Sequence, residues 1–196
     1  VAHLPINLES LSVDFLSASA HKFHGPKGSG LLFIRSGLSM KPFIHGGSQE
    51  RNMRSGTENI ANIVGFAKAL EIAAQHHEED KVYIQSLKTT MQELLREHLS
   101  DIHFHGDCNP ETSLYTVLNA GFGLNSKTEM LSINLDVAGI AISGGSACSS
   151  GAQTGSHVIR AAYPHHNRVP LRFSFSKHNT FEELETVVKK ISEFVS

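Results

Sequence analysis

The sequence predicts an α/β fold, and three observations lead to that prediction. Short apolar runs of β-forming residues, which suit buried strands, occur at Val13–Ala18 and Gly30–Arg35. From Glu58 onward, apolar residues recur every three or four positions, the spacing of an amphipathic helix. Beyond the polar stretch at His76–Asp80, segments of strand and helix character alternate to the end of the chain. Mixed strands and helices of this kind pack as α/β layers.

The polar stretch and the spacing of apolar residues also predict the domains and the later helices and strands. We expect a boundary in the polar stretch, with residues 1–75 in one domain and residues 76–196 in a second. The later helices are expected at Tyr83–His98, at Thr128–Asp136 and from Thr180 to the end, and the later strands at Ile102–His105, Tyr115–Asn119, Ile140–Ser143 and Leu171–Phe175. For the last helix, Thr180 and Glu183 have the spacing of a capping box.

Composition and charge exclude several classes of protein. The chain of 196 residues has 40% hydrophobic and 18% charged residues, which is ordinary for a globular protein with a sizeable core. Its net charge of −2 gives no electrostatic attraction for nucleic acid or an anionic membrane. No apolar run is long enough to cross a bilayer, and the first residues lack the pattern of a signal peptide. Two cysteines are too few for a disulfide framework, so we expect a cytoplasmic protein with reduced thiols.

One stretch of the second domain resembles neither a strand nor a helix. Ser143–Ser156 contains only small and polar residues, with Cys148 near its centre, so no large apolar side chain can anchor it in a core. A long segment of this kind inside a compact domain is often functional. On composition alone, a functional loop with a working thiol and a solvated linker with an incidental thiol are both open.

The first motif with chemistry surrounds Lys22, which follows the end of a predicted strand and precedes a glycine-rich turn. A lysine that bonds covalently to a carbonyl cofactor needs such a fixed backbone, with donors for a phosphate nearby. Ser19 and His21 alternate along the strand and so can point the same way, toward one phosphate. The turn is not a Walker A loop, because Lys27 precedes Gly28. A plain hairpin with a surface lysine is the alternative.

Four segments resemble, in the same order, those of cysteine desulfurases, which are fold-type I enzymes of the class-V aminotransferase kind that use pyridoxal 5'-phosphate (PLP). They are SASAHKFHGPKGSGLLFIR around the lysine, HGGSQERNMRSGTEN at 45–59, SGGSACSSG at 143–151 and LRFSFSKHNT at 171–180. The cysteine context is similar to that of the iron–sulfur and nitrogenase-type branch. The resemblance covers nearly the whole chain and corresponds to the C-terminal half of those enzymes. It implies the end of the PLP-binding large domain, followed by the small C-terminal domain.

The resemblance implies where the cofactor is held. Lys22 would bond covalently to PLP, and Ser19 and His21 would bind its phosphate. Thr57 would reach across the interface of a homodimer to the phosphate in the partner subunit. No residue is expected to bind a metal. The thirteen histidines include neighbouring pairs, but none has the cysteine or carboxylate spacing of a structural zinc site.

The resemblance also implies a reaction. Arg172 would hold the carboxylate of the substrate L-cysteine with a bidentate fork. Lys22, freed from the cofactor, would act as a base, and a Cys148 thiolate would take the substrate sulfur as a persulfide while alanine leaves. The sulfur would then pass to an acceptor protein such as an iron–sulfur scaffold, for cluster or thio-cofactor synthesis.

In that family, residues that complete the cofactor pocket precede the segment that matches Val1. They are a histidine that stacks on the PLP ring, an aspartate at its nitrogen and a glutamine at its phenolic oxygen. We therefore expect the isolated chain to bind PLP poorly and to have no useful turnover. We also expect the strands at Val13–Ala18 and Gly30–Arg35 to lack sheet neighbours.

Two other functions stay open. A selenocysteine lyase, or another fold-type I PLP lyase, would share the fold but need not depend on Cys148. A non-catalytic paralogue that only binds a scaffold protein would need none of Lys22, Cys148 and Arg172, and the presence of all three favours an enzyme. The second cysteine, Cys108, is expected to be a structural or surface thiol, with His105 packed beside it in a loop.

Overall fold

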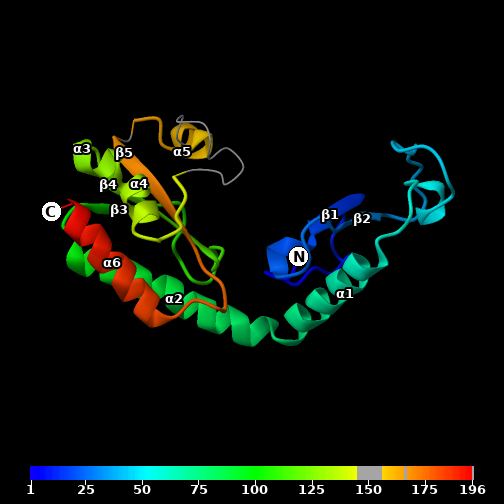
Figure 1. The fold of residues 1–196 in the computed structure, drawn as a ribbon, viewed down its shortest axis with the longest axis horizontal. Helices are drawn as coiled ribbons and strands as arrows, with labels where there is room; N and C mark the ends of the chain where they lie inside the picture. The colour runs from blue at the N-terminus through cyan, green and yellow to red at the C-terminus, as the bar shows by residue number, and fades with distance from the viewer. Residues whose placement is uncertain (145–155, 166, 196) are drawn as a thin grey trace. The chain divides into compact units, whose positions relative to one another are not determined.

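The structure, a computed structural model, describes residues 1–144, 156–165 and 167–195. It divides into two compact units, with unit 1 at Val1–Glu78 and unit 2 at Glu79–Ser196 (Figure 1). Each unit has its own antiparallel sheet. Among the described residues, no helix has the length and apolar character needed to cross a membrane.

Unit 1 is built on a two-stranded hairpin. Strands β1 (Phe15–Ser19) and β2 (Gly30–Ile34) pair antiparallel, with Ser19 opposite Gly30. The expectation that these two strands lack sheet neighbours is wrong in that they pair with each other, but neither pairs with a further strand among the described residues. The turn between them contains a short 3-10 helix, η1 (Ala20–Phe23).

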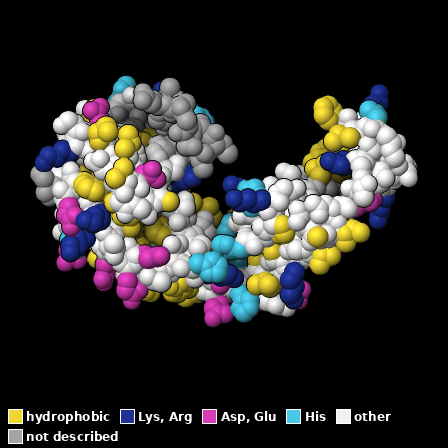
Figure 2. All heavy atoms as spheres, in the orientation of Figure 1, with side chains coloured by type: hydrophobic (Ala, Val, Ile, Leu, Met, Phe, Trp, Pro, Cys, Tyr) yellow, Lys and Arg dark blue, Asp and Glu magenta, His cyan; other side chains and the backbone are white. Residues whose placement is uncertain are grey.

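Helix α1 (Ile60–Gln75) confirms the change to helical period and packs on the hairpin turn. The rings of Phe23 and Phe66 meet edge to face, with centroids 5.2 Å apart. A side chain at Gly65 would overlap Pro26, because its Cβ would lie 2.6 Å from the proline ring. The glycine therefore allows the helix to approach the turn closely. Much of the apolar surface of α1 is nevertheless exposed (Figure 2).

Unit 2 has a three-stranded antiparallel sheet in the order β3–β4–β5. Its strands are β3 (Ile102–His105), β4 (Val117–Gly123) and β5 (Arg168–Ser174), and the helices of this part of the chain are α2 (His77–His98), α3 (Ser126–Glu129), α4 (Leu131–Val137), α5 (His157–Ala162) and α6 (Phe181–Val195). One apolar cluster joins the sheet to α2, α4 and α6. Its members include the fully buried side chains Leu87, Leu118, Leu131 and Ile191. Removal of such side chains from water is the main stabilising contribution to a fold.

Several elements differ from those that the sequence predicts. The polar stretch interrupts the helix only at His76, since α1 ends at Gln75 and α2 begins at His77. The acidic side chains that follow suit the positive end of the helix dipole. The expected helix at Thr128–Asp136 is two helices, α3 and α4, which meet at Met130. The described residues Ile140–Ser143 form no strand, and Ser143 alone makes a bridge, opposite Arg172.

The start of α6 confirms the capping box. Thr180 Oγ1 accepts a hydrogen bond from the Glu183 amide at 3.3 Å, and a Glu183 carboxylate oxygen accepts one from the Thr180 amide at 3.1 Å. The side chain of Asn179 also donates to this carboxylate, at 3.0 Å. These hydrogen bonds, with that from Asn179 the largest effect, lower the pKa of Glu183. The cap therefore favours an ionised glutamate.

Candidate functional site

Lys22 lies on the η1 turn between two buried side chains. Ala20 is fully buried and Phe23 is 4% exposed, whereas His21 and Lys22 between them are exposed. Ser19, which ends β1, is exposed as well. The apolar pair therefore fixes the turn, and the hydroxyl, imidazole and ammonium groups of the three polar residues face outward.

Backbone hydrogen bonds hold this turn in one conformation. The Ala20 amide donates to the Ser29 carbonyl at 3.0 Å, and the Gly25 amide donates to the Ala20 carbonyl at 2.9 Å. His24 ends the 3-10 helix with a left-handed φ of 64°. A Cβ at Gly25 would lie 2.8 Å from the Cβ of Ala20, so glycine is needed for this closure. Lys22 is thus carried on a preorganised backbone, as a covalent cofactor site requires.

The donors on this turn fit a phosphate-bearing aldehyde cofactor. A hydroxyl (Ser19) and an imidazole (His21) can donate to phosphate oxygens, and the adjacent lysine supplies the amine. One expectation about their placement is corrected. Strand β1 ends at Ser19, so His21 belongs to η1. The side chain of His21 therefore faces outward because of its place in the 3-10 helix, and not because side chains alternate along a strand.

His3 is a neighbour of Lys22 that sequence reasoning missed. Its half-buried ring hydrogen-bonds to the backbone of Lys22. Burial lowers the pKa of His3 and outweighs this bond, which raises it, while the charges of the N-terminus and His77 lower the pKa further. No local pattern predicts the contact, because the two residues are far apart in the sequence.

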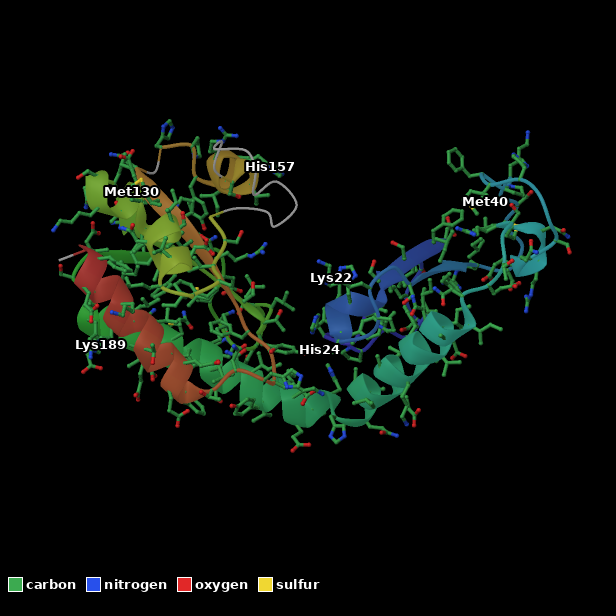
Figure 3. All side chains as sticks on the ribbon, in the orientation of Figure 1. Lys22, His24, Met40, Met130, His157 and Lys189 are labelled. Carbon is green, nitrogen blue, oxygen red and sulfur yellow. The ribbon has the colours of Figure 1, made fainter. Side chains whose placement is uncertain are left out.

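Thr57 lies in an exposed segment that leads into α1. The second 3-10 turn, η2 (Glu50–Asn52), precedes it and has left-handed φ values of 48°, 56° and 63° at three successive residues. Each such residue costs about 1–2 kcal/mol when it is not glycine. The side chain of Gln49 closes the turn by accepting a hydrogen bond from the Gly56 amide at 3.1 Å. Figure 3 shows Met40, also in the segment between β2 and α1, well apart from Lys22 within unit 1.

Arg172 is fixed in the sheet of unit 2. It lies on β5 opposite Asn119 of β4, and its amide donates to the Ser143 carbonyl at 2.7 Å. Its Nε atom is buried and has no hydrogen-bond partner among the described residues. A buried donor without a partner costs about 1–3 kcal/mol, which an incoming carboxylate would recover.

Of the two cysteines, only Cys108 lies among the described residues. Cys148 lies outside the described residues, so its expected role stays a prediction. Cys108 is a free, partly buried thiol that packs against the core of unit 2. His105 ends strand β3, which agrees with the strand predicted at Ile102–His105, and Cys108 lies in the loop that follows.

Lys88 is a buried charged group in the same unit. Its Nζ atom donates to Ser113 Oγ at 2.8 Å and to the Leu114 carbonyl at 2.9 Å. Burial lowers the pKa of Lys88, while the charges of Cys108 and Asp107 raise it. The residue therefore ties the segment before β4 to α2, which is a structural role.

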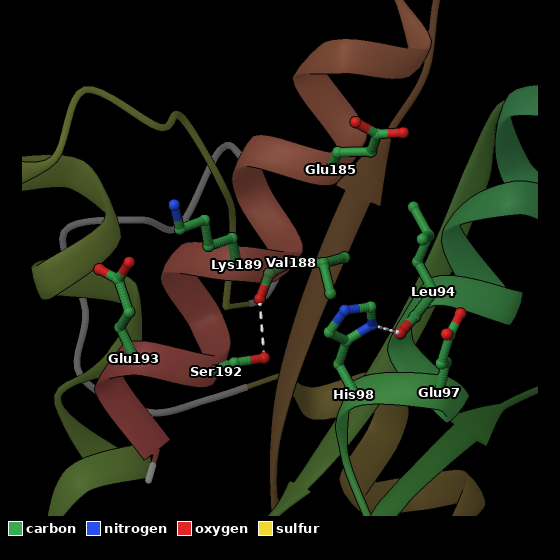
Figure 4. A pocket seen from close by; sticks show the side chains of 8 residues that line it. All are labelled: Leu94, Glu97, His98, Glu185, Val188, Lys189, Ser192 and Glu193. Atoms are coloured by element: carbon green, nitrogen blue, oxygen red, sulfur yellow. Dashed lines mark hydrogen bonds between the residues drawn. The ribbon is translucent and has the colours of Figure 1, made fainter.

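A groove between α2 and α6 contains none of the expected site residues (Figure 4). Leu94 and Val188 are among the residues that line it, and His98 Nδ1 hydrogen-bonds to the Leu94 carbonyl at 3.0 Å. In the part of the chain that the structure describes, no three His, Cys, Asp or Glu side chains are grouped to hold a metal ion.

The fold and the lysine turn together define the class of protein. The chain belongs to the aminotransferase class-V family, whose family model matches residues 1–187. It is 36% identical over 98% of its length to a protein from Bacillus subtilis named putative cysteine desulfurase IscS 1, of which it covers 51%. It is 40% identical over its whole length to a cysteine desulfurase from Sinorhizobium fredii, of which it covers 50%.

A solved structure gives the same result. A NifS-like protein, 36% identical, aligns with 99% of this chain and 49% of its own at a TM-score of 0.85. The α/β class and the resemblance to cysteine desulfurases are thereby confirmed. The chain spans about half the length of the relatives it matches.

Proposed function

We propose that this chain is part of a PLP-dependent cysteine desulfurase that moves sulfur from L-cysteine to Cys148 and releases alanine. The observation that carries the proposal is the exposed Lys22 on a rigid turn, between the buried Ala20 and Phe23. It is supported by relatives that bear the name cysteine desulfurase and align along the whole chain.

Each polar residue of the proposed cofactor site has a separate role. Lys22 would hold the cofactor, and its amine would serve as the base for the proton on the substrate Cα. Ser19 and His21 would donate to the cofactor phosphate, and Thr57 would donate to the same group in the partner subunit of a homodimer. The bound cofactor supplies the electron sink for the carbon that loses its proton.

Arg172 orients the substrate. Its guanidinium, with a buried Nε that lacks a partner among the described residues, pairs with the carboxylate of L-cysteine. The β5 ladder and the bridge to Ser143 hold the arginine backbone. The reacting sulfur is thereby held in a defined orientation.

Cys148 accepts the sulfur. Its thiolate forms the new sulfur–sulfur bond while the carbon–sulfur bond of the substrate breaks. The bonding pair stays with the carbon, which takes up protons to become alanine, and no outside oxidant is needed. The persulfide then passes to an acceptor such as an iron–sulfur scaffold. The free thiol of Cys108 suits a reducing compartment, so we place the reaction in the cytoplasm.

The chain alone is proposed to bind PLP weakly and to turn over little. Unit 1 offers donors for phosphate and an amine, but the chain spans about half the length of its relatives, and the family resemblance assigns the partners of the ring nitrogen and the phenolic oxygen to the other half. Joining the chain to the N-terminal half of the Sinorhizobium fredii relative is expected to restore both properties. Desulfurase activity of the chain alone, equal to that of the joined protein, would contradict this proposal.

Borohydride reduction with PLP, followed by peptide mass analysis of the joined protein, tests the lysine. A pyridoxyl adduct is expected on Lys22 and is expected to disappear in Lys22→Ala. Lys27→Ala is the matched control, because Lys27 is exposed on the same hairpin and should leave the adduct intact. An adduct on Lys27, or none at all, would favour the paralogue that only binds a scaffold.

The two cysteines separate a desulfurase from a lyase. Cys148→Ala should abolish persulfide formation from L-cysteine, whereas Cys108→Ala should leave it unchanged. Because Cys108 is the other cysteine of the chain, it is a matched control. Full activity of the Cys148 variant, with release of free sulfide or selenide, would instead support a selenocysteine lyase or another fold-type I lyase.

A further inference from the structure

The segment that leads into β1 is held mainly by polar contacts. Residues 3–14 form no helix or strand, and the apolar side chains Leu4, Ile6 and Leu11 are exposed. Burial of apolar surface therefore contributes little to the position of this segment. Hydrogen bonds fix it at two places, to the side chain of Arg35 and to the backbone of Lys22.

Arg35, which follows the end of β2, binds the later part of this segment. Its Nε atom donates to the Val13 carbonyl at 2.9 Å, and its Nη2 atom donates to the carbonyls of Leu8 at 3.0 Å and Leu11 at 2.8 Å. The Arg35 amide donates to the Asp14 carbonyl at 3.0 Å. A guanidinium is planar and its donors have fixed directions, so these hydrogen bonds, the Arg35 clamp, allow the segment one path along the hairpin.

The part of the segment that the Arg35 clamp holds is itself folded into a turn. The Leu11 amide donates to the Asn7 carbonyl at 2.9 Å, and the Glu9 amide donates to Asn7 Oδ1 at 2.9 Å. Asparagine favours such turns because its side chain hydrogen-bonds to the backbone two residues on. The clamp therefore acts on a preorganised piece of chain.

His3, near the other end of the segment, reaches the backbone of Lys22. Burial lowers the pKa of the half-buried His3 ring, and the hydrogen bond to Lys22 opposes this effect. A hydrogen bond that raises the pKa of a histidine favours its protonated form, so the ring is the donor and the Lys22 carbonyl is the acceptor. Because the net effect lowers the pKa of His3, the ring is neutral at pH 7 and donates through one nitrogen.

The Lys22 carbonyl lies where a donor from outside the helix is useful. Lys22 belongs to η1, and the last carbonyls of a helix have no amide ahead of them in the same helix. The Gly25 amide donates to the Ala20 carbonyl at 2.9 Å, which closes the turn at its start. Histidine side chains can bind the last carbonyls of a helix in the same way. His3 thus supports the end of the turn that carries the lysine.

We propose that His3 is a positioning residue for Lys22, which the Arg35 clamp places against the Lys22 carbonyl so that the lysine turn keeps one conformation. This inference rests on the proposed function, in which Lys22 holds the cofactor. Since the contact is with the backbone, His3 acts through the position of the lysine and takes no part in proton transfer.

Hydrogen exchange of the full chain tests the contact of His3. His3→Leu keeps an apolar side chain of similar size but removes the donor, so the Ala20 and Gly25 amides should exchange about fivefold faster. His3→Asn and His3→Gln keep an N–H donor near the place of Nδ1 and Nε2 respectively, and at least one should restore slow exchange. His45→Leu is the matched control, because His45 is an exposed histidine of the same unit, and it should leave both amides unchanged.

Three results of this experiment would overturn the proposal. Slow exchange in His3→Leu would show that the donor is not needed. Fast exchange in both amide variants would mean that the shape of the ring matters and its hydrogen bond does not. Rapid exchange of the Ala20 and Gly25 amides in the unaltered chain would mean that there is no fixed turn to support.

A second pair of variants tests whether the Arg35 clamp places His3. Arg35→Lys keeps the charge but loses the fork of donors, so the Leu11 amide and the Ala20 amide should both exchange faster. Arg54→Lys is the matched control, because the Arg54 side chain donates to the carbonyl of its neighbour Ser55 at 2.7 Å. It should leave both amides unchanged. Faster exchange at Leu11 alone would overturn the link between the clamp and the lysine turn.

The rate of cofactor attachment in the joined protein tests the consequence. His3→Leu should slow the appearance of the borohydride-trapped pyridoxyl adduct on Lys22 roughly tenfold, as expected for a displaced reactant, and the amide variant that restores slow exchange should also restore the rate. Faster exchange with an unchanged rate would overturn the positioning role. If the unaltered joined protein forms no adduct, the proposed function fails, and the exchange experiments still decide whether His3 holds the turn.

Discussion

The two units of the molecule differ in how they bury apolar surface. Unit 2 has one continuous cluster that joins the sheet to three helices. Among the described residues of unit 1, the buried apolar side chains are only Ala20 and Phe23. In α1, Ile60, Ile63 and Val64 are exposed, and Figure 2 shows hydrophobic side chains over this part of the surface.

This difference indicates which unit can support itself. A two-stranded hairpin is only marginally stable without further packing, whereas a three-stranded sheet covered by helices can be stable by itself. The chemistry follows the same division. Lys22 and the proposed phosphate donors Ser19 and His21 lie on the poorly packed unit, and Arg172 lies in the sheet of the well-packed one. Substitutions of apolar residues in the two units should therefore lower the free energy of unfolding by different amounts.

The largest difference is expected between a core leucine of unit 2 and an apolar residue of α1. Leu131 is fully buried, so Leu131→Ala should lower the free energy of unfolding of unit 2 by about 2–5 kcal/mol. Ile63 is 47% exposed, and Ile63→Ala should change the stability of unit 1 by no more than about 0.5 kcal/mol. Urea unfolding followed by residue-level hydrogen exchange measures both. Equal losses of stability in the two variants would contradict the inference that unit 2 is better packed than unit 1.

A smaller effect is expected where the sheet of unit 2 is tightly packed. Gly121→Ala should cost about 1–3 kcal/mol, because the new methyl group overlaps the ring of His105. Gly144→Ala is the control, since its Cβ would lie 3.8 Å from the Pro170 carbonyl oxygen, an ordinary contact. The double variant with His105→Ala should lose less than the sum of the two single changes. Strict additivity would mean that the overlap is not the cause.

Several elements could be predicted from the sequence because their signals are local. The bounds of β3 agree with the predicted Ile102–His105, and the contacts of Thr180 and Glu183 confirm the capping box. Helix α5 was missed, because six residues are too few to show a helical period. Strand β4 extends to Gly123, beyond the predicted end at Asn119, because glycines hide strand character in a sequence.

The residues of the candidate site could be proposed from sequence motifs, but the geometry of the site could not be predicted from the sequence. The family resemblance implied the roles of Lys22 and Ser19, but the buried Ala20 and Phe23 that fix the turn show no pattern of their own. The contacts of His3 with Lys22 and of Tyr163 with Gly106 join residues that are distant in the chain. Such contacts depend on tertiary packing, which local propensity does not encode.

The smallest effect is expected at the cap of α6, as a dependence on pH. The pKa of Glu183 is lower in the folded chain than in the unfolded chain, mainly because of the hydrogen bond from Asn179. Its contribution to stability is therefore complete above the unfolded carboxyl pKa of about 4.3, and it is lost as the pH falls through the lowered folded value. Glu183→Gln should destabilise unit 2 at pH 7, and its difference from the unaltered chain should shrink below about pH 4. Glu185→Gln, on the same helix but outside the cap, is the control. Urea unfolding at pH 7 and at acidic pH measures the difference, and a difference that grows toward acid would contradict the assignment of the cap.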